Sequence, residues 1–216
     1  MAAQERLIIV GAGGFGREIY FWARDCHAAG TVPQLGGYID DEVESLPGYD
    51  NSRVGSIADY TPREGDQFVV ALGEPAKKRK LVEMLQGRGA KFARLIHPTC
   101  TVVSTAALGE GVIMCPYAMA MPDSRAERFV TILNYSGIGH DAVAGEFTTL
   151  SSVVDVTGGV KVGAGVSIGS GARLLPGITV GDGATIGAGA IVVRSVKPGV
   201  TVFAAPAKTL TMRTRG

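Results

Sequence analysis

The sequence of 216 residues predicts two architectures in one chain, a Rossmann-like α/β half-domain over residues 1–94 and an all-β parallel β-helix over residues 95–216. Three observations support this division. Strand-like and helix-like segments alternate in the first part, a glycine-rich turn joins its first strand to its first helix, and a six-residue apolar repeat runs through the second part. The 31 glycines gather at residues 11–16 and in the C-terminal half, in agreement with this division.

Short apolar runs and helical periodicities alternate in the N-terminal part. The expected strands are residues 7–10, 36–40, 68–73 and 91–96, and the expected helices are residues 17–30 and 75–89. Such alternation predicts a parallel sheet covered on both faces, with a ligand site at the carboxyl ends of its strands. The basic run at residues 76–80 is expected to be a solvated helix face.

The turn Gly11-x-Gly13-x-x-Gly16 follows a strand and opens a helix. Glycines in this context let the backbone approach a phosphate, which the helix N-terminus then binds. Asp40, at the end of the second strand, is placed to accept hydrogen bonds from a ribose or a base. A tight turn without a ligand is the alternative. An NAD-dependent oxidoreductase is disfavoured, because 94 residues make half a dinucleotide fold and no substrate domain of a dehydrogenase follows.

The C-terminal part carries an apolar residue at every sixth position from Ile96 to Val192, seventeen positions without an exception. Each six-residue unit is one short strand and a corner, so the ladder residue points into a narrow core and glycine suits the corner. Residues 96–197 then form between five and six coils of three units each. The flat sides of such a prism are usually buried in trimers closed by rotation, which predicts a homotrimer.

Composition excludes several classes of partner. The net charge is +1 with both signs interspersed, which argues against a nucleic-acid or anionic-membrane surface. We expect no membrane span, because no apolar run approaches the ~18–20 residues required. We also expect no signal peptide. Cys26, Cys100 and Cys115 lack the spacing of a disulfide framework or a zinc site. These features predict a cytoplasmic protein.

Several motifs together resemble one family. They are IIVGAGGFGRE, YIDD, VALG, LIHPTC, NYSGIGHDAVAGEF and the closing APAK, and they are spread over nearly the whole chain. The chain resembles bacterial sugar acyltransferases of the NeuD/PglD type. This resemblance implies that the β-helix is left-handed and binds acetyl-CoA, and that the small domain binds a nucleotide sugar. It also implies acetyl transfer to an amine or hydroxyl of that sugar.

The resemblance also implies site residues. Residues for the acceptor lie around the glycine loop, the strand ends and one corner of the β-helix: Gly13, Gly14, Phe15, Asp40, Asp41, Gly73 and Asn134. Residues for acetyl-CoA are Thr149, Gly158, Ser170, Ala188 and Lys208, of which Gly158 aligns with a backbone N–H for the thioester oxygen. Phe15 and Thr149 stand where nucleotide-aminosugar enzymes commonly have histidine. The identity of the acceptor therefore stays open: it is another nucleotide sugar, a free sugar, or a small amine or alcohol.

His140 and Asp141 are the expected catalytic pair. Acyl transfer needs a base for the proton of the attacking group, and neutral imidazole has the side-chain pKa nearest neutrality. Ile138 takes the ladder position, so His140 falls at or near a corner, where Asp141 can hold the tautomer of its ring. His97 and His27 are expected to be structural.

Two further classes compete with an acyltransferase. A non-catalytic nucleotide-sugar-binding or scaffold protein on the same fold would bind without turnover, and the His140–Asp141 pair argues against it. A zinc carbonic anhydrase of the gamma type needs three histidine ligands per site, and His140 has no companions at ligand spacing, so no metal is expected.

Overall fold

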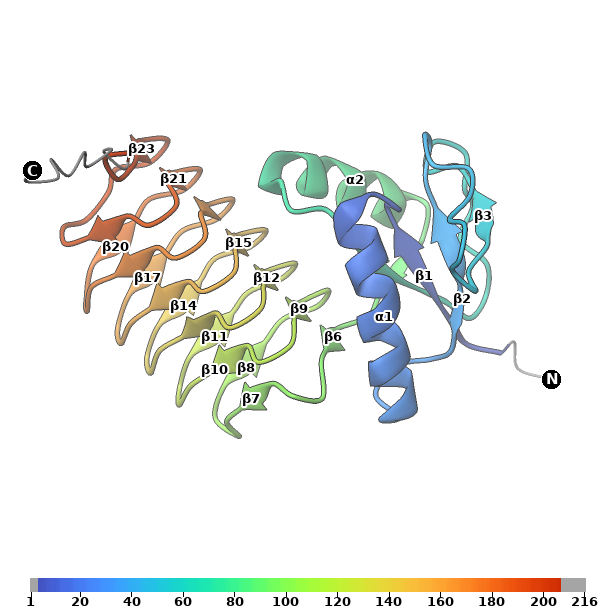
Figure 1. Cartoon of the computed structure of the whole chain (residues 1–216), viewed down its shortest axis with the longest axis horizontal. Coiled ribbons are helices and arrows are strands. Elements are labelled where there is room, and N and C mark those ends of the chain that lie inside the picture. The colour runs from blue at the N-terminus through green and yellow to red at the C-terminus, as the bar shows by residue number, and fades with distance from the viewer. Residues whose placement is uncertain (1–3, 207–216) are drawn as a thin grey trace, which may run out of the picture.

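The computed structural model describes residues 4–206, and Figure 1 shows an α/β part and a long parallel β-helix side by side along the longest axis. The mixed α/β and β-helix architecture expected from the sequence is confirmed. None of the helices within residues 4–206 has the length and apolar character needed to cross a membrane.

The N-terminal sheet has five parallel strands in the order β3-β2-β1-β4-β5. The elements are β1 (Arg6–Val10), α1 (Gly14–Ala28), β2 (Leu35–Ile39), β3 (Arg53–Gly55), β4 (Asp66–Val70), α2 (Pro75–Gly87) and β5 (Lys91–Phe92). Alternate residues of β1 enter different cores: Ile9 packs in the cluster that includes α1, and Ile8 in the cluster that includes α2. Both faces of the sheet are therefore covered, as the alternation of strands and helices predicts.

Two details differ from the sequence-based expectation. Strand β3 was not expected, because its three residues are too short to show a pattern. Residues 91–96 do not form one strand: β5 ends at Phe92, and β6 (Leu95–Ile96) pairs with β9 in the β-helix. The reason lies in the backbone hydrogen bonds, since the N–H of Ala93 donates to Phe68 and the N–H of Leu95 already donates to Val112.

The β-helix consists of eighteen two-residue strands, β6 to β23, in three parallel sheets of seven, six and five strands. After β6 these strands are β7 (Thr101–Val102), β8 (Ala107–Leu108), β9 (Ile113–Met114), β10 (Met119–Ala120), β11 (Arg125–Ala126), β12 (Thr131–Ile132), β13 (Gly137–Ile138), β14 (Val143–Ala144), β15 (Thr149–Leu150), β16 (Asp155–Val156), β17 (Lys161–Val162), β18 (Ser167–Ile168), β19 (Arg173–Leu174), β20 (Thr179–Val180), β21 (Thr185–Ile186), β22 (Ile191–Val192) and β23 (Thr201–Val202). The second residue of each strand from β9 to β22 is buried in one continuous core. This row is the predicted six-residue ladder.

The corners of the β-helix need a left-handed backbone conformation. Glycine supplies it in most of the later coils, as at Gly159 and Gly177. The middle coils instead hold seven other residues at positive φ: Tyr117, Asp123, Phe129, Tyr135, Asp141, Phe147 and Val153. Such a conformation is costly for a residue with a Cβ. The middle coils therefore bear backbone strain at corners that carry side chains, of which Phe129 and Phe147 are buried.

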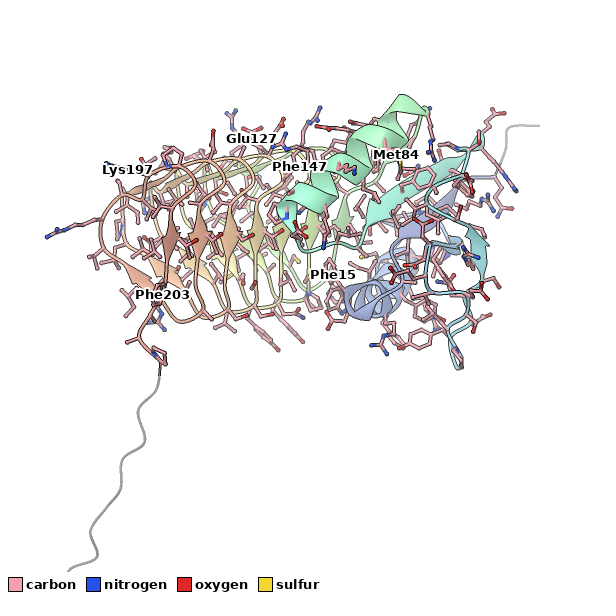
Figure 2. The ribbon with its side chains drawn as sticks, turned by 90° about the horizontal axis from the view of Figure 1, so that it is seen from above. Phe15, Met84, Glu127, Phe147, Lys197 and Phe203 are labelled. Carbon is pink, nitrogen blue, oxygen red and sulfur yellow. The ribbon has the colours of Figure 1, made fainter. Side chains whose placement is uncertain are left out.

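The α/β part packs on the seven-stranded sheet of the β-helix. Phe129 and Phe147 stack at a centroid distance of 5.1 Å, and Phe92 of β5 meets Phe129 edge-on at 5.0 Å. The guanidinium of Arg79 on α2 lies 4.3 Å from the centroid of Phe147. Figure 2 shows α2 lying along the β-helix with Phe147 beside it. Aromatic packing of this kind joins the two parts into one body.

Candidate active site

His140 and Asp141 occupy the corner between β13 and β14. Nδ1 of His140 lies 2.8 Å from Oδ2 of Asp141, and the two side chains are 71% and 64% exposed. The left-handed backbone of Asp141 (φ +59°) is held on both sides, because its N–H donates to Pro122 and its carbonyl accepts from Nζ of Lys161 at 2.8 Å. With Nδ1 donating to the carboxylate, Nε2 has a free lone pair for a proton.

Gly158 lies against the ring of His140, one coil further along the β-helix. A Cβ at Gly158 would be 2.6 Å from Cε1 of His140, so a side chain there would force the exposed ring to move. The N–H of Gly158 donates no hydrogen bond to another group within residues 4–206, whereas the N–H of Gly159 donates to the carbonyl of His140. A free backbone donor and a free imidazole nitrogen thus stand at one corner, as acyl transfer requires.

The other residues expected to bind acetyl-CoA lie elsewhere on the same chain. Ser170 and Ala188 are exposed at the corners after β18 and β21, between the seven-stranded and six-stranded sheets. Asn134, which was predicted for the acceptor, lies on the same edge after β12. His140 and Gly158 lie on the next edge, between the six-stranded and five-stranded sheets. Within one chain the six-stranded sheet separates the two sets. Lys208 falls outside the described residues.

Thr149 is buried instead of open to a ligand. Its hydroxyl accepts a hydrogen bond of 3.1 Å from Nζ of Lys78, which also donates to the hydroxyl of Thr131 at 2.9 Å. The expectation of a wholly solvated basic face on α2 is wrong at Lys78, whose side chain is only 1% exposed, and its burial lowers the pKa of its amine to about 7. The spacing of Pro75, Lys78, Val82 and Leu85 was the available signal, because it marks one helix face.

The glycine loop leaves the N-terminus of α1 open. Gly13 caps the helix without a side-chain hydrogen bond, and no acidic residue occupies the first turn. A Cβ at Gly13 or Gly14 would meet nothing within 4 Å, whereas Gly16 packs too closely on the carbonyl of Gly11 to bear a side chain. Unpaired N–H groups at a helix N-terminus favour an anion, so this loop suits a phosphate.

Asp40 braces this loop. Oδ2 accepts the N–H of Ala12 at 2.7 Å, and Oδ1 accepts the N–H groups of Glu42 and Val43 at 2.8 and 2.7 Å. Burial raises the pKa of Asp40, but these three donors outweigh burial and leave the pKa below its usual value. The carboxylate that was expected to bind a ribose or base thus already ties the glycine loop to the loop after β2.

The remaining predicted acceptor residues border the same edge of the sheet. Asp41 is exposed and accepts the N–H of Ala58 at 3.1 Å. Gly73 is exposed just beyond β4, the neighbour of β1, with open space where a Cβ would stand. Phe15 is half-buried on the α1 side of the sheet, with its ring 6.3 Å from that of Trp22. Figure 2 shows Phe15 on α1 close to the β-helix.

The other two histidines hold structure together. Nε2 of His97 lies 3.2 Å from Oδ2 of Asp25 on α1, and Nδ1 of His97 lies 2.8 Å from the hydroxyl of Thr99. Nδ1 of His27 lies 3.1 Å from the carbonyl of Val32. Among residues 4–206 there is no group of three His, Cys, Asp or Glu side chains that could hold a metal ion.

Comparison with known families and structures covers both parts of the chain. The model of the PglD N-terminal domain matches residues 6–85, and that of the bacterial transferase hexapeptide (six repeats) matches residues 159–194. The acetyltransferase domain of PglB from Neisseria gonorrhoeae FA1090, solved in complex with acetyl coenzyme A, is 28% identical with a TM-score of 0.83; the match covers 96% of this chain and 100% of that one.

Two further solved structures are similar over the same length. WeeI from Acinetobacter baumannii AYE is 26% identical with a TM-score of 0.83, over 96% of this chain and 100% of that one. PerB from Caulobacter crescentus, solved in complex with CoA and GDP-perosamine, is 27% identical with a TM-score of 0.83, over 95% of this chain and 97% of that one. The two family matches and these structural similarities together support a PglD-type sugar acyltransferase with hexapeptide repeats.

Proposed function

We propose that this protein transfers an acetyl group from acetyl-CoA to an amine or hydroxyl of a nucleotide-linked sugar, with His140 as the general base. The observation that carries the proposal is the corner at which His140 is hydrogen-bonded to Asp141 and lies against Gly158. The open glycine loop supports a phosphate-bearing acceptor. The structures of related proteins with acetyl-CoA, or with CoA and GDP-perosamine, support the two substrates.

The proposed reaction uses few groups. The acceptor nitrogen or oxygen attacks the thioester carbon while Nε2 of His140 takes its proton, and Asp141 stabilises the imidazolium that forms. The N–H of Gly158 donates to the oxygen that becomes negative in the tetrahedral intermediate. The carbon–sulfur bond then breaks, and the proton held by His140 passes to the departing CoA sulfur. The acetylated sugar and CoA leave, and the histidine is neutral again.

We infer that the working unit is a homotrimer in the cytoplasm, with each site shared by two chains. The α/β part packs on the seven-stranded sheet, whereas His140 lies on the edge that this sheet does not border. A sugar held at the glycine loop is therefore better placed for His140 of a neighbouring copy. Rotational closure would likewise bring the edge with Ser170 and Ala188 to a neighbour's His140 edge.

The direct test measures CoA release with acetyl-CoA and a panel of nucleotide aminosugars. We expect turnover with at least one acceptor, and a loss of about 10²–10⁴-fold in His140→Ala, the usual worth of a general base. Undiminished turnover in His140→Ala would refute the mechanism. Binding of a nucleotide sugar without any turnover would favour a binding or scaffold protein on this fold.

A second test concerns the shared site. His140→Ala and Gly14→Phe, which fills the glycine loop, are each expected to be inactive alone. In mixed trimers about a quarter of the sites would join an intact loop to an intact His140 of the neighbouring chain, so activity should return. Mixtures that stay inactive would contradict a shared site, and a monomer by sedimentation would contradict the trimer.

A further inference from the structure

Lys78 is the most unusual buried group outside the proposed site. Its amine is fully enclosed between α2 and the seven-stranded sheet, and no carboxylate of the described residues pairs with it. Its two acceptors are the neutral hydroxyls of Thr131 and Thr149. A buried ammonium without a counter-ion is expensive, and a methionine would fill similar space without that penalty.

The charged groups nearest in the chain and on the facing coils are occupied elsewhere. On α2, Lys77 pairs with Glu74 at 2.9 Å, and Arg79 lies over Phe147. At the corners before β12 and β15, Arg128 and Glu146 pair with each other at 3.3 Å. Burial alone accounts for the lowered pKa of Lys78. The amine is therefore held by the two hydroxyls and by the shape of its enclosure.

The two threonines have a specific relation to the proposed catalytic pair. Thr131 begins β12 and Thr149 begins β15, and these strands are neighbours in the same sheet with the two threonines in register. The chain between them makes one full coil, and that coil carries His140 and Asp141. One amine thus bridges the start and the end of the coil that bears the base.

The same amine comes from the first turns of α2, the helix that follows the Gly73 loop. Other side-chain hydrogen bonds between the α/β part and the β-helix attach to its first coil, as from Cys26 to Ile96 and between Asp25 and His97. Within residues 4–206, only Lys78 donates such a bond from the α/β part to a later coil. It is thus a direct hydrogen-bonded link between the predicted acceptor domain and the coil with the base.

We propose that Lys78 is a positioning residue for acetyl transfer, which sets the acceptor domain on the His140 coil through Thr131 and Thr149. This inference rests on the proposed function. In a rotationally symmetric trimer every chain repeats the same placement, so a shift of α2 in one protomer displaces the acceptor at the shared site. A displacement of about 1 Å far from the reacting atoms can cost about 10²-fold in rate.

The test compares Lys78→Met with Lys77→Met, which alters the adjacent lysine whose side chain is 75% exposed. In Lys78→Met we expect kcat/KM for the acceptor to fall about 10- to 100-fold, with the KM for acetyl-CoA unchanged and Tm at pH 7 equal or higher. Lys77→Met should leave all three unchanged. Faster amide hydrogen exchange over residues 73–87 in Lys78→Met alone would show that α2 is less firmly held.

Three outcomes would overturn the inference. The first is that Lys78→Met keeps the wild-type kcat/KM. The second is that amide hydrogen exchange over α2 is unchanged in this variant. The third is that its Tm and its affinity for both substrates fall together, which indicates structural support alone. Should Lys78→Met fail to fold, Thr149→Val, which keeps the shape and removes one acceptor hydroxyl, replaces it. If the wild type acetylates no acceptor, the proposed function fails, while the exchange comparison still decides whether Lys78 holds α2.

Discussion

The imidazole of His140 lies directly over Gly158, so close that a Cβ at Gly158 would stand 2.6 Å from Cε1 of the ring. The ring is 71% exposed and can swing outward, so an added methyl group would displace it at little cost in stability. The glycine therefore determines where the proposed base stands. This contact between neighbouring coils makes the following substitution informative.

Gly158→Ala is expected to lower kcat by about 10²-fold, because it moves the base away from the acceptor, while Tm changes little. Steady-state kinetics and thermal unfolding check this. Gly137→Ala is the matched control in the coil of His140, since a Cβ there lies no closer than 3.4 Å to Met119. An unchanged kcat in Gly158→Ala would mean that the ring does not act from this position.

Asp141→Asn tests the orienting carboxylate. Asparagine tolerates the left-handed backbone that Asp141 adopts, so the corner is kept while the charge beside Nδ1 is lost. We expect kcat to fall as the imidazolium loses its stabilisation, by less than the about 10⁴-fold of a buried triad carboxylate, because the Asp141 side chain is 64% exposed. Asp123→Asn, one coil earlier at φ +58°, should leave the rate unchanged. Equal rates in both variants would contradict a role for the Asp141 carboxylate.

The stability of the protein should depend on the ionisation of Lys78. Its pKa is about 7 in the folded chain against 10.5 ordinarily, so the unfolded chain binds the proton more tightly between these values. This group therefore makes the free energy of unfolding rise with pH from about 7 to 10.5. Below pH 7 the folded state bears the full penalty of burying the protonated amine.

Lys78→Met should remove that penalty, so its gain in Tm over the wild type is expected to be larger at pH 6 than at pH 9. Thermal unfolding at both values checks this, with Lys77→Met as the control. A gain that does not vary with pH would show that the amine keeps its ordinary pKa in the folded state.

Val153 is a β-branched residue held at φ +63° on an exposed corner, where it is 58% exposed. Val153→Gly relieves this conformation and should raise the free energy of unfolding by about 1 kcal/mol. The larger conformational entropy that glycine loses on folding offsets part of this gain. Gly171 stands one coil later at φ +72°, so Gly171→Val is expected to lose a similar amount. Chemical denaturation measures both, and a destabilised Val153→Gly would show that packing of Val153 outweighs its strain.

The sequence alone was sufficient for the main architecture, because both signals are local. A six-residue apolar ladder allows one class of core, and Gly11, Gly13 and Gly16 between a strand and a helix specify a tight turn with an open helix N-terminus. The place of His140 at a corner followed from the ladder, since Ile138 takes the inward position. The neighbouring carboxylate was also visible, although its contact with the ring was not.

Only the tertiary structure decided which polar groups are free and which are occupied. Asp40 looks like a ligand group in the sequence, yet its oxygens accept three backbone N–H groups. Lys78 looks solvated, yet it is buried against Thr131 and Thr149, more than fifty residues away in the chain. Periodicity reports the inner face of each element, but it does not report which element covers the outer face. Packing between segments that are distant in the sequence decides which element covers an outer face. It therefore decides which side chains are buried, which pKa values shift and where we propose a positioning role.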